Sequence, residues 1–195
     1  FPVGHLQKSD VRRMAREAGL AVAEKKDSTG ICFIGERKFR EFLRRYLPAQ
    51  PGDVVSAEGE RVGRHEGLMY YTIGQRRGLG IGGRGSGARW FVAEKDVEKN
   101  RLVVVQGEGH PKLYSSACRT GEMHFVAGEP PAAAFACRAK FRYRQSDQDV
   151  YVRMQNGAAH IEFAKKQRAV TPGQYAVLYD GDVCLGGGVV EQVYE

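Results

Sequence analysis

Four cysteines are the residues of this 195-residue chain best suited to covalent chemistry: Cys32, Cys118, Cys137 and Cys184. No two of them form a C-x-x-C pair, which argues against a zinc knuckle or a thioredoxin-type motif. Four cysteines are also too few for a disulfide scaffold, so a reducing, cytoplasmic setting is expected. Cys137 and Cys184 lie in β-type runs and are expected to pack in a core, whereas Cys118 has no distinguishing context.

Cys32 has the most suggestive surroundings of the four. It follows a polar turn and has three cationic neighbours in sequence, Lys25, Lys26 and Arg37. Cations lower the pKa of a thiol and increase the fraction of reactive thiolate. The apolar residues on either side equally fit a buried strand, in which cysteine packs as a small hydrophobe. The local residues favour the buried interpretation and leave a reactive thiol as the alternative.

Basic residues are concentrated in parts of the chain. The whole sequence has 30 Lys+Arg against 23 Asp+Glu, a formal net charge of +7. Residues 1–50 have an excess of five positive charges, and residues 61–89 contain six arginines but a single acid, Glu66. Residues 174–195 contain four acids and neither Lys nor Arg. Basic patches suit a polyanion such as RNA or DNA, and a solvated basic face fits the charge pattern equally well.

Two further segments combine cations with groups that bind nucleic acid. Residues 141–145 read FRYRQ, so in a strand the two arginines share one face and the two aromatic rings the other. An ordinary amphipathic strand has the same pattern. Residues 165–168 read KKQR and form a second basic cluster.

A glycine-rich segment formally matches a nucleotide-binding motif. Residues 78–83 read GLGIGG, which satisfies G-x-G-x-x-G. A dinucleotide site needs a helix directly afterwards, and residues 84–89 (RGSGAR) have no helical character. We therefore reject a Rossmann site. Preceded by Gln75, Arg76 and Arg77, this loop is better suited to following a phosphate backbone. The five histidines are scattered, so no metal site is expected.

The elements that must position these residues are mostly strands. A helix is predicted between Ser9, its candidate N-cap, and Gly19, and a second over residues 38–46, ended by Pro48. Beyond Pro51 the helical period disappears. The turn pairs Asn156-Gly157 and Asp180-Gly181 predict type I′ hairpins. We expect no internal repeat and no membrane span. Strands are predicted at 53–55, 68–73, 90–96, 101–106, 136–143, 150–155, 159–163, 175–179 and 183–185, with a further β block starting near Ser116.

Several long blocks of the chain resemble the tRNA-specific 2-thiouridylases, in the right order and from end to end. The blocks are residues 27–35 (DSTGICFIG), 46–52 (YLPAQPG), 67–83 (GLMYYTIGQRRGLGIGG), 141–145 (FRYRQ), 168–174 (RAVTPGQ) and 180–188 (DGDVCLGGG).

The resemblance implies a mainly β fold with a short helical N-terminal part, in which a small central β domain is followed by a C-terminal antiparallel β-barrel. Residues 1–48 would be a helical remnant of an ATP-pyrophosphatase domain, residues 49–114 the central domain, and residues 115–195 a tRNA-binding barrel. The Phe1 start fits a chain that begins inside a domain.

The implied activity is replacement of O2 of the tRNA wobble uridine by sulfur. ATP adenylates the uridine oxygen, Cys32 carries the sulfur as a persulfide, and an upstream cysteine attacks or resolves that persulfide, with disulfide formation. A persulfide-donating sulfur-relay protein is the implied partner besides tRNA. The ATP loop S-G-G-x-D-S is absent from this sequence. ATP is therefore expected to bind in the missing N-terminal domain, and this polypeptide alone is expected to be inactive.

The resemblance also assigns tRNA-binding residues in the barrel, namely Arg142, Tyr143 and Gln174. Gln75, Arg76 and Arg77 are our own, weaker candidates. Two other interpretations stay open: a non-catalytic RNA-binding β-barrel module, and a translation-factor-like barrel used for protein contacts.

Overall fold

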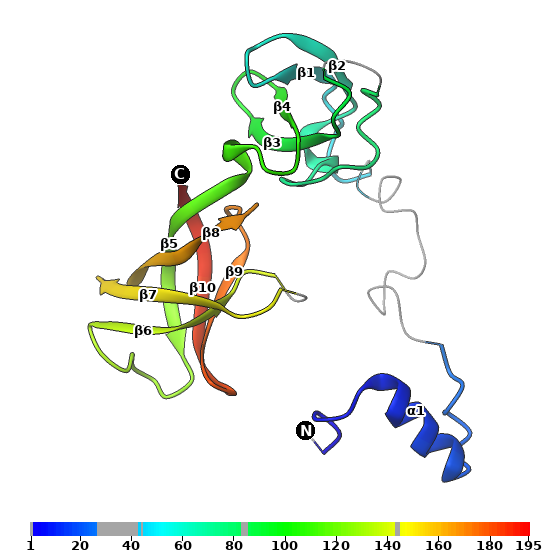
Figure 1. Ribbon diagram of the computed structural model, residues 1–195, viewed down its shortest axis with the longest axis vertical. Coiled ribbons are helices and arrows are strands. Elements are labelled where there is room, and N and C mark those ends of the chain that lie inside the picture. Colours follow the sequence, from blue (N-terminus) through cyan, green and yellow to red (C-terminus); the bar gives the residue numbers. More distant parts are fainter. Residues whose placement is uncertain (1, 27–42, 44, 83–85, 143–144) are drawn as a thin grey trace. The chain divides into compact units, whose positions relative to one another are not determined.

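The structure is a computed structural model in which most regular elements are strands, and this confirms the predicted mainly β fold (Figure 1). The chain divides into two compact units, Phe1–Pro48 and Ala49–Glu195. None of the helices in the described stretches is long and apolar enough to cross a bilayer. The stretches that the structure describes are residues 2–26, 43, 45–82, 86–142 and 145–195.

The first unit contains one helix, α1 (Lys8–Glu17), among its described residues. The prediction that Ser9 caps this helix is wrong. The backbone at Gln7 is extended and the helical turn starts directly after it, so Ser9 already lies inside the helix. Gly19 ends the helix region as predicted, with a positive φ of 66° that suits glycine. Of the second predicted helix, residues 38–42 and 44 lie outside the described residues; residue 43 is helical, and residues 45 and 46 form a turn.

The second unit begins with a four-stranded sheet in the order β2-β1-β4-β3, which we call the sheet domain (Figure 1). β1 pairs parallel with β4, and the other two pairs are antiparallel. The strands predicted at 53–55, 90–96 and 101–106 are confirmed, whereas β2 was not predicted. The strands are β1 (Gly52–Ser56), β2 (Arg61–His65), β3 (Trp90–Asp96) and β4 (Arg101–Gln106).

The strand predicted at 68–73 is wrong. Leu68–Tyr70 is a 3-10 helix, η1, and no strand follows it before β3 among the described residues. Tyr70 and Tyr71 are both buried. A strand buries two consecutive side chains only when both of its faces are covered, whereas a helical turn is not bound by this alternation.

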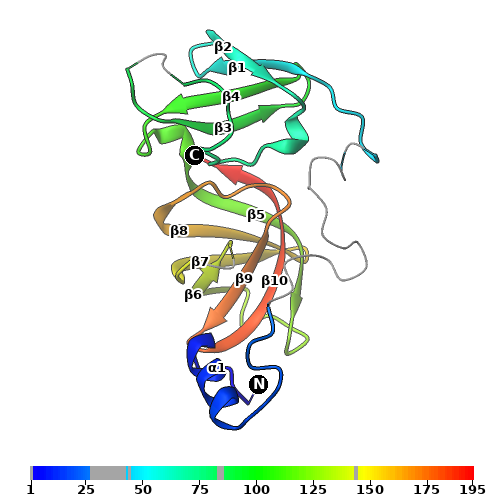
Figure 2. The ribbon, with the colours of Figure 1, turned by 90° about the vertical axis from the view of Figure 1, so that its right-hand side faces the viewer.

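The rest of the second unit is a closed barrel with the strand order β10-β5-β8-β7-β6-β9 (Figure 2). Every neighbouring pair is antiparallel. Closure removes the free sheet edges, and the predicted C-terminal antiparallel barrel is confirmed. A short 3-10 helix, η2 (Pro111–Leu113), leads into it. The barrel strands are β5 (Tyr114–Phe125), β6 (Ala134–Lys140), β7 (Gln148–Gln155), β8 (Ala158–Arg168), β9 (Tyr175–Asp180) and β10 (Val183–Tyr194).

The two predicted hairpin turns differ in outcome. Both residues of the 156–157 pair have positive φ and connect paired strands directly, as a type I′ turn requires. The prediction at Asp180 is wrong, because Asp180 itself pairs with Val183. The loop residues are therefore Gly181 and Asp182, and only Gly181 has a positive φ. That pattern is typical of a type II′ turn.

The barrel core separates the cysteines by environment. Cys118 is fully buried among Val152, Ile161 and Leu178, and burial raises the pKa of its thiol to about 12. Cys137 is partly buried against the same core, and burial, followed by the charge of a nearby aspartate, raises its pKa to about 11. The predicted core packing of Cys184 is wrong. It is exposed, and it lies near the start of β10, where it pairs with Tyr179 of β9 beside the hairpin turn.

Candidate nucleic-acid interface

A basic groove of about 530 Å³ lies on the barrel, and four of its lining residues are cations. The other lining residues are three glutamines and a tyrosine, and no carboxylate lines the groove in the described part of the chain. Cations without compensating acids attract a polyanion. We call this feature the barrel groove; its lining residues are Tyr114, Arg142, Gln145, Gln148, Lys165, Lys166, Gln167 and Arg168.

Three glutamine side chains hold the loop between β6 and β7 against β8. Gln145 Nε2 donates to Gln167 Oε1 (2.8 Å), and Gln167 Nε2 donates to Gln148 Oε1 (3.0 Å). Gln167 is buried, so these bonds are partly shielded from water. The chain of amides fixes the loop that carries Arg142 beside the basic end of β8. Sequence reasoning missed this function of the glutamines, because their partners lie about 20 residues away.

The predicted strand through residue 143 is wrong, because β6 ends at Lys140. Phe141 does pack in the barrel core, with its ring centroid 4.9 Å from that of Phe163. Its backbone N–H donates to the side chain of Gln145 at 3.1 Å rather than to a neighbouring strand, and the chain turns there. Tyr143 and the following arginine lie outside the described residues, so the face predicted for the two arginines stays a prediction.

Arg142 lies where the barrel meets the sheet domain. Its Nη2 donates to the carbonyl oxygen of Ile73 at 3.2 Å and to that of Ala169 at 2.8 Å. Burial of part of the guanidinium, followed by the charge of Arg168, lowers the pKa of Arg142. The side chain nevertheless keeps substantial exposure to solvent. Arg142 therefore connects two domains and can still present positive charge to a ligand.

The residues around Gln75 form a tight turn in the sheet domain. Gln75 Oε1 accepts from the backbone N–H of Thr72 at 3.0 Å, and Gly74 has a φ of 81°. Backbone bonds in both directions join the turn to Val92 on β3. A Cβ at Gly74 would lie 2.8 Å from the Cβ of Ala169, so glycine permits the close approach of the barrel.

The residues around Gln174 repeat this turn in the barrel. Gln174 Oε1 accepts from the backbone N–H of Thr171 at 3.1 Å, Gly173 has a φ of 87°, and backbone bonds join the turn to Val190 on β10. Both turns read T-x-G-Q, so a four-residue repeat exists where none was expected. Thr171 Oγ1 donates to the same Ala169 carbonyl that accepts from Arg142. Arg142 therefore links the two turns.

Two features suit the predicted candidates to RNA contact. The Nε2 of Gln174 donates to no acceptor in the described part of the chain, which leaves two N–H groups for a ligand. Arg76 and Arg77 are both exposed. The Gln75 amide differs from that of Gln174, because its Nε2 already donates to the Arg77 carbonyl at 2.9 Å.

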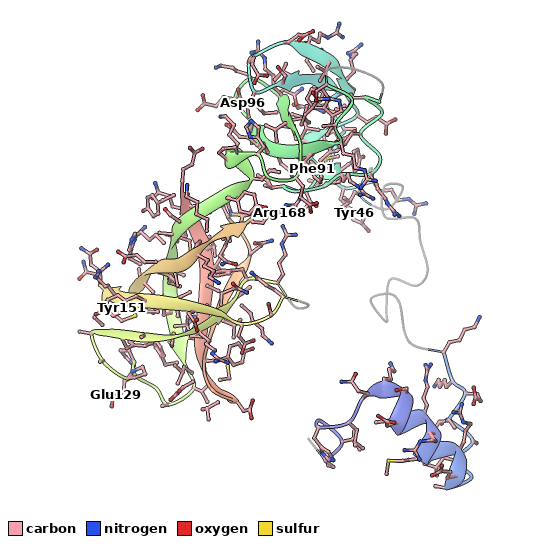
Figure 3. The ribbon with its side chains drawn as sticks, viewed as in Figure 1. Tyr46, Phe91, Asp96, Glu129, Tyr151 and Arg168 are labelled. Atoms are coloured by element: carbon pink, nitrogen blue, oxygen red, sulfur yellow. The ribbon has the colours of Figure 1, made fainter. Side chains whose placement is uncertain are left out.

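Arg168 makes a second contact between the domains. Its guanidinium lies over the ring of Phe91 on β3, 5.1 Å from the ring centroid (Figure 3). A cation over an aromatic face is attracted by the ring quadrupole. The cation was predicted only as part of a basic cluster, and its aromatic partner was missed. Cys32, the predicted sulfur carrier, lies outside the described residues.

Three family models match consecutive parts of the chain. They describe a tRNA methyl transferase HUP domain at residues 1–36, a tRNA methyl transferase PRC-barrel domain at 40–106 and an aminomethyltransferase β-barrel domain at 115–190. The last two matches coincide with the sheet domain and the closed barrel. The fold and the family models together place the chain in a class of proteins in which a HUP domain precedes two β domains.

Curated relatives identify the family within this class. The chain is 57% identical over 194 residues to the tRNA-specific 2-thiouridylase MnmA of Alkaliphilus oremlandii, covering 99% of this chain and 53% of that protein. It is 58% identical over 195 residues to that of Geobacillus thermodenitrificans, covering 100% of this chain and 52% of that protein. The chain belongs to the tRNA-specific 2-thiouridylase family. It spans about half the length of these relatives.

Proposed function

We propose that the chain provides the sulfur-carrying segment and the tRNA-holding β domains of an enzyme that converts the wobble uridine of tRNA into 2-thiouridine. The observation that carries the proposal is the barrel groove, with four cations and no described carboxylate, in a chain that matches tRNA-specific 2-thiouridylases over its whole length. Arg142, Tyr143 and Gln174 bind tRNA in the barrel, and Gln75, Arg76 and Arg77 assist from the sheet domain.

Cys32 is proposed as the persulfide carrier. Three cations near it in sequence favour the thiolate form, which accepts and transfers sulfur by thiol exchange. The thiols of Cys118 and Cys137 are poor alternatives, since burial raises the pKa of both far above neutrality. Cys184 is exposed but lies on the β10 hairpin, which carries no neighbouring Lys or Arg in sequence.

ATP, which the family implies, does not fit the described residues. The S-G-G-x-D-S pattern is absent, and the glycine-rich segment after Arg77 is not followed by a helix among the residues described before β3. We therefore place adenylation of the uridine oxygen outside this chain, in the enzyme's N-terminal domain. Sulfur reaches Cys32 from a sulfur-relay protein, and the enzyme acts in the cytoplasm. The 195-residue chain alone is expected to bind tRNA without modifying it.

The catalytic part of the proposal is tested by Cys32→Ser in the full-length protein, with Cys184→Ser as the matched control. We expect Cys32→Ser to abolish 2-thiouridine formation with tRNA affinity unchanged, and the control to retain activity. Unchanged thiolation by Cys32→Ser would remove Cys32 from the mechanism and favour a non-catalytic RNA-binding module.

The binding part is tested by titrating the 195-residue chain with tRNA at 50 and 200 mM salt. A protein that makes several phosphate contacts loses affinity steeply between these concentrations. Salt-independent or undetectable binding would favour a barrel used for protein contacts. Robust thiolation by the 195-residue chain would refute the proposed location of the ATP site.

A further inference from the structure

A second cavity, of about 470 Å³, is lined by residues of the sheet domain alone. We call it the glycine cavity. It is distinct from the barrel groove, with which it shares no lining residue. Its lining residues are Arg76, Gly78, Leu79, Gly80, Ile81, Gly82, Gly87, Ala88, Arg89 and Trp90.

One wall of the glycine cavity is the exposed backbone of residues 78–82, which is anchored by buried side chains. Leu79 and Ile81 are buried, while the glycines that alternate with them are exposed. A Cβ at Gly80 or Gly82 would meet no atom within 4 Å, so the space above the backbone is open. Ile81 packs closely over Gly63 of β2: a Cβ added at Gly63 would lie 2.5 Å from Cγ2 of Ile81. The wall is therefore anchored, and a ligand can approach its main chain.

This backbone also offers hydrogen-bond donors. Gly78 and Gly80 have positive φ values of 76° and 68°, and they alternate with residues of negative φ. Glycines of positive φ at alternate positions suit the concave backbone arrangements in which successive N–H groups bind anions. The main-chain N–H groups of residues 78–82 donate to no acceptor in the part of the chain that the structure describes.

A second part of the lining, residues 87–90, is held by a side chain from the sheet. Gln106, at the end of β4, accepts from the backbone N–H of Ser86 at 3.0 Å and donates to the carbonyl of Ala88 at 3.1 Å. The backbone N–H of Gly107 donates to the carbonyl of Arg89 at 2.9 Å. Both parts of the lining are thus held by the sheet, the first through Ile81 on β2 and the second through bonds to the end of β4.

The charge of the glycine cavity is positive. Arg76 and Arg89 line it, both are exposed, and no carboxylate lines it in the described part of the chain. Trp90 lines the same space, and its indole N–H has no acceptor among the described residues. Guanidinium groups and backbone amides together are the donors that recognise phosphate oxygens.

We propose that the glycine cavity binds a backbone phosphate of the tRNA, held between Arg76 and Arg89 over the amides of residues 78–82. This inference rests on the proposed function, because it makes the sheet domain a second point of attachment for the same RNA. It assigns Arg76 a backbone phosphate as its ligand and adds Arg89, which the sequence did not single out, to the residues that contact RNA. Arg77 is exposed but does not line the cavity, so we exclude it from this site.

Trp90 provides a direct test, since it is the only tryptophan in the 195 residues. The emission of the 195-residue chain is measured during titration with tRNA, with a single-stranded oligoribonucleotide and with inorganic phosphate, and Trp90→Phe supplies the background. We expect tRNA to change the emission in parallel with binding. A change with inorganic phosphate but none with either RNA would overturn the proposal in favour of a free-phosphate site.

Charge-neutralising variants test the contact itself. Arg76→Gln and Arg89→Gln are each compared with Arg101→Gln, an exposed arginine at the opposite end of β4 from Gln106. One phosphate contact contributes a slope of about 0.9 in log affinity against log salt, or about eightfold in affinity at 0.1 M salt. We expect this loss from the two cavity variants and a smaller one from Arg101→Gln, with unchanged circular dichroism in all three.

The outcomes separate this inference from the proposed function. If tRNA binds with a steep salt dependence, yet Trp90 emission is constant and the cavity variants bind like Arg101→Gln, the glycine cavity is not a phosphate site and the barrel groove alone holds the RNA. If tRNA does not bind at all, the proposed function fails and the inference fails with it.

Discussion

The contact that Arg142 makes between the two β domains allows a quantitative prediction. In Arg142→Ala, the carbonyls of Ile73 and Ala169 both lose the guanidinium donor, while the Ala169 carbonyl keeps the hydroxyl of Thr171. A hydrogen bond from a charged donor contributes about 1.5–3 kcal/mol when buried, and less in contact with water. One of these bonds is exposed and the other is partly buried, so we estimate a combined loss of about 2 kcal/mol.

This loss corresponds to a decrease in Tm of about 4–8 °C for a chain of this length. Arg142→Lys keeps the positive charge but presents a single ammonium on a flexible stem, which is poorly suited to reach both carbonyls. We expect it to lose about half as much stability. The lysine variant nevertheless retains the salt dependence of tRNA binding, because the charge facing the RNA is kept.

Two probes measure the effect separately on the two domains. Trp90 fluorescence reports on the sheet domain, since this is the only tryptophan, and far-UV circular dichroism reports on all strands. In the unmodified chain we expect the two thermal transitions of the Ala49–Glu195 unit to coincide. In Arg142→Ala they should separate, because the link between the T-x-G-Q turns is lost.

The matched control is Arg138→Ala on β6. Among the residues that the structure describes, the Arg138 side chain forms only a surface ion pair with Asp149, at 3.7 Å. Such pairs typically contribute 0–1 kcal/mol. If Arg142→Ala shifts Tm by no more than this control and the two transitions still coincide, the bonds of Arg142 do not couple the domains and our reasoning is refuted.

Three further predictions concern the barrel. Gly186→Ala should lower the free energy of unfolding in urea by about 3 kcal/mol, because Gly186 has a φ of 154° and a Cβ would lie 2.2 Å from the carbonyl oxygen of His124. The control Gly128→Ala, at a φ of 89° and with no atom within 4 Å of the added Cβ, should lower it by about 1 kcal/mol. Equal losses in the two variants would exclude the steric explanation. Burial raises the pKa of Cys118 to about 12, so the unfolded chain releases this proton first. Stability should therefore decrease between pH 9 and 12, by at most about 1.4 kcal/mol per pH unit, and a Cys118→Ala variant with the same pH slope would contradict this assignment. In native protein, iodoacetamide should modify the exposed Cys184 and spare Cys118 until unfolding, as mass spectrometry can show; simultaneous modification would refute the burial difference.

Local patterns predicted much of the fold. The strands at 90–96 and 101–106 were found at the predicted residues, because β-branched and aromatic side chains there suit a sheet. The turn at 156–157 was predictable because Asn and Gly tolerate positive φ. The longest barrel strands were predicted too short, since the polar ends of β8 and β10 depend on neighbouring strands for their hydrogen bonds.

The chemistry of single residues depended on contacts that the sequence does not reveal. Cys118 and Cys184 both lie in β strands, yet one is buried and the other exposed, because exposure is decided by position in the closed barrel. Tyr70 and Tyr71 look like part of a strand, but Tyr70 ends a 3-10 helix and both side chains are buried in the folded domain.

The sequence by itself determined the family, the mainly β architecture and the excess of basic residues, since motif blocks, strand patterns and charge are properties of the linear chain. Only the tertiary structure decided what Arg142 touches, because its two acceptors lie 69 and 27 residues away along the chain. Only the structure placed Arg76 and Arg89 on one cavity beside Trp90. Backbone carbonyls and amides are common to all residues, so no sequence pattern marks which of them a distant side chain or ligand will meet.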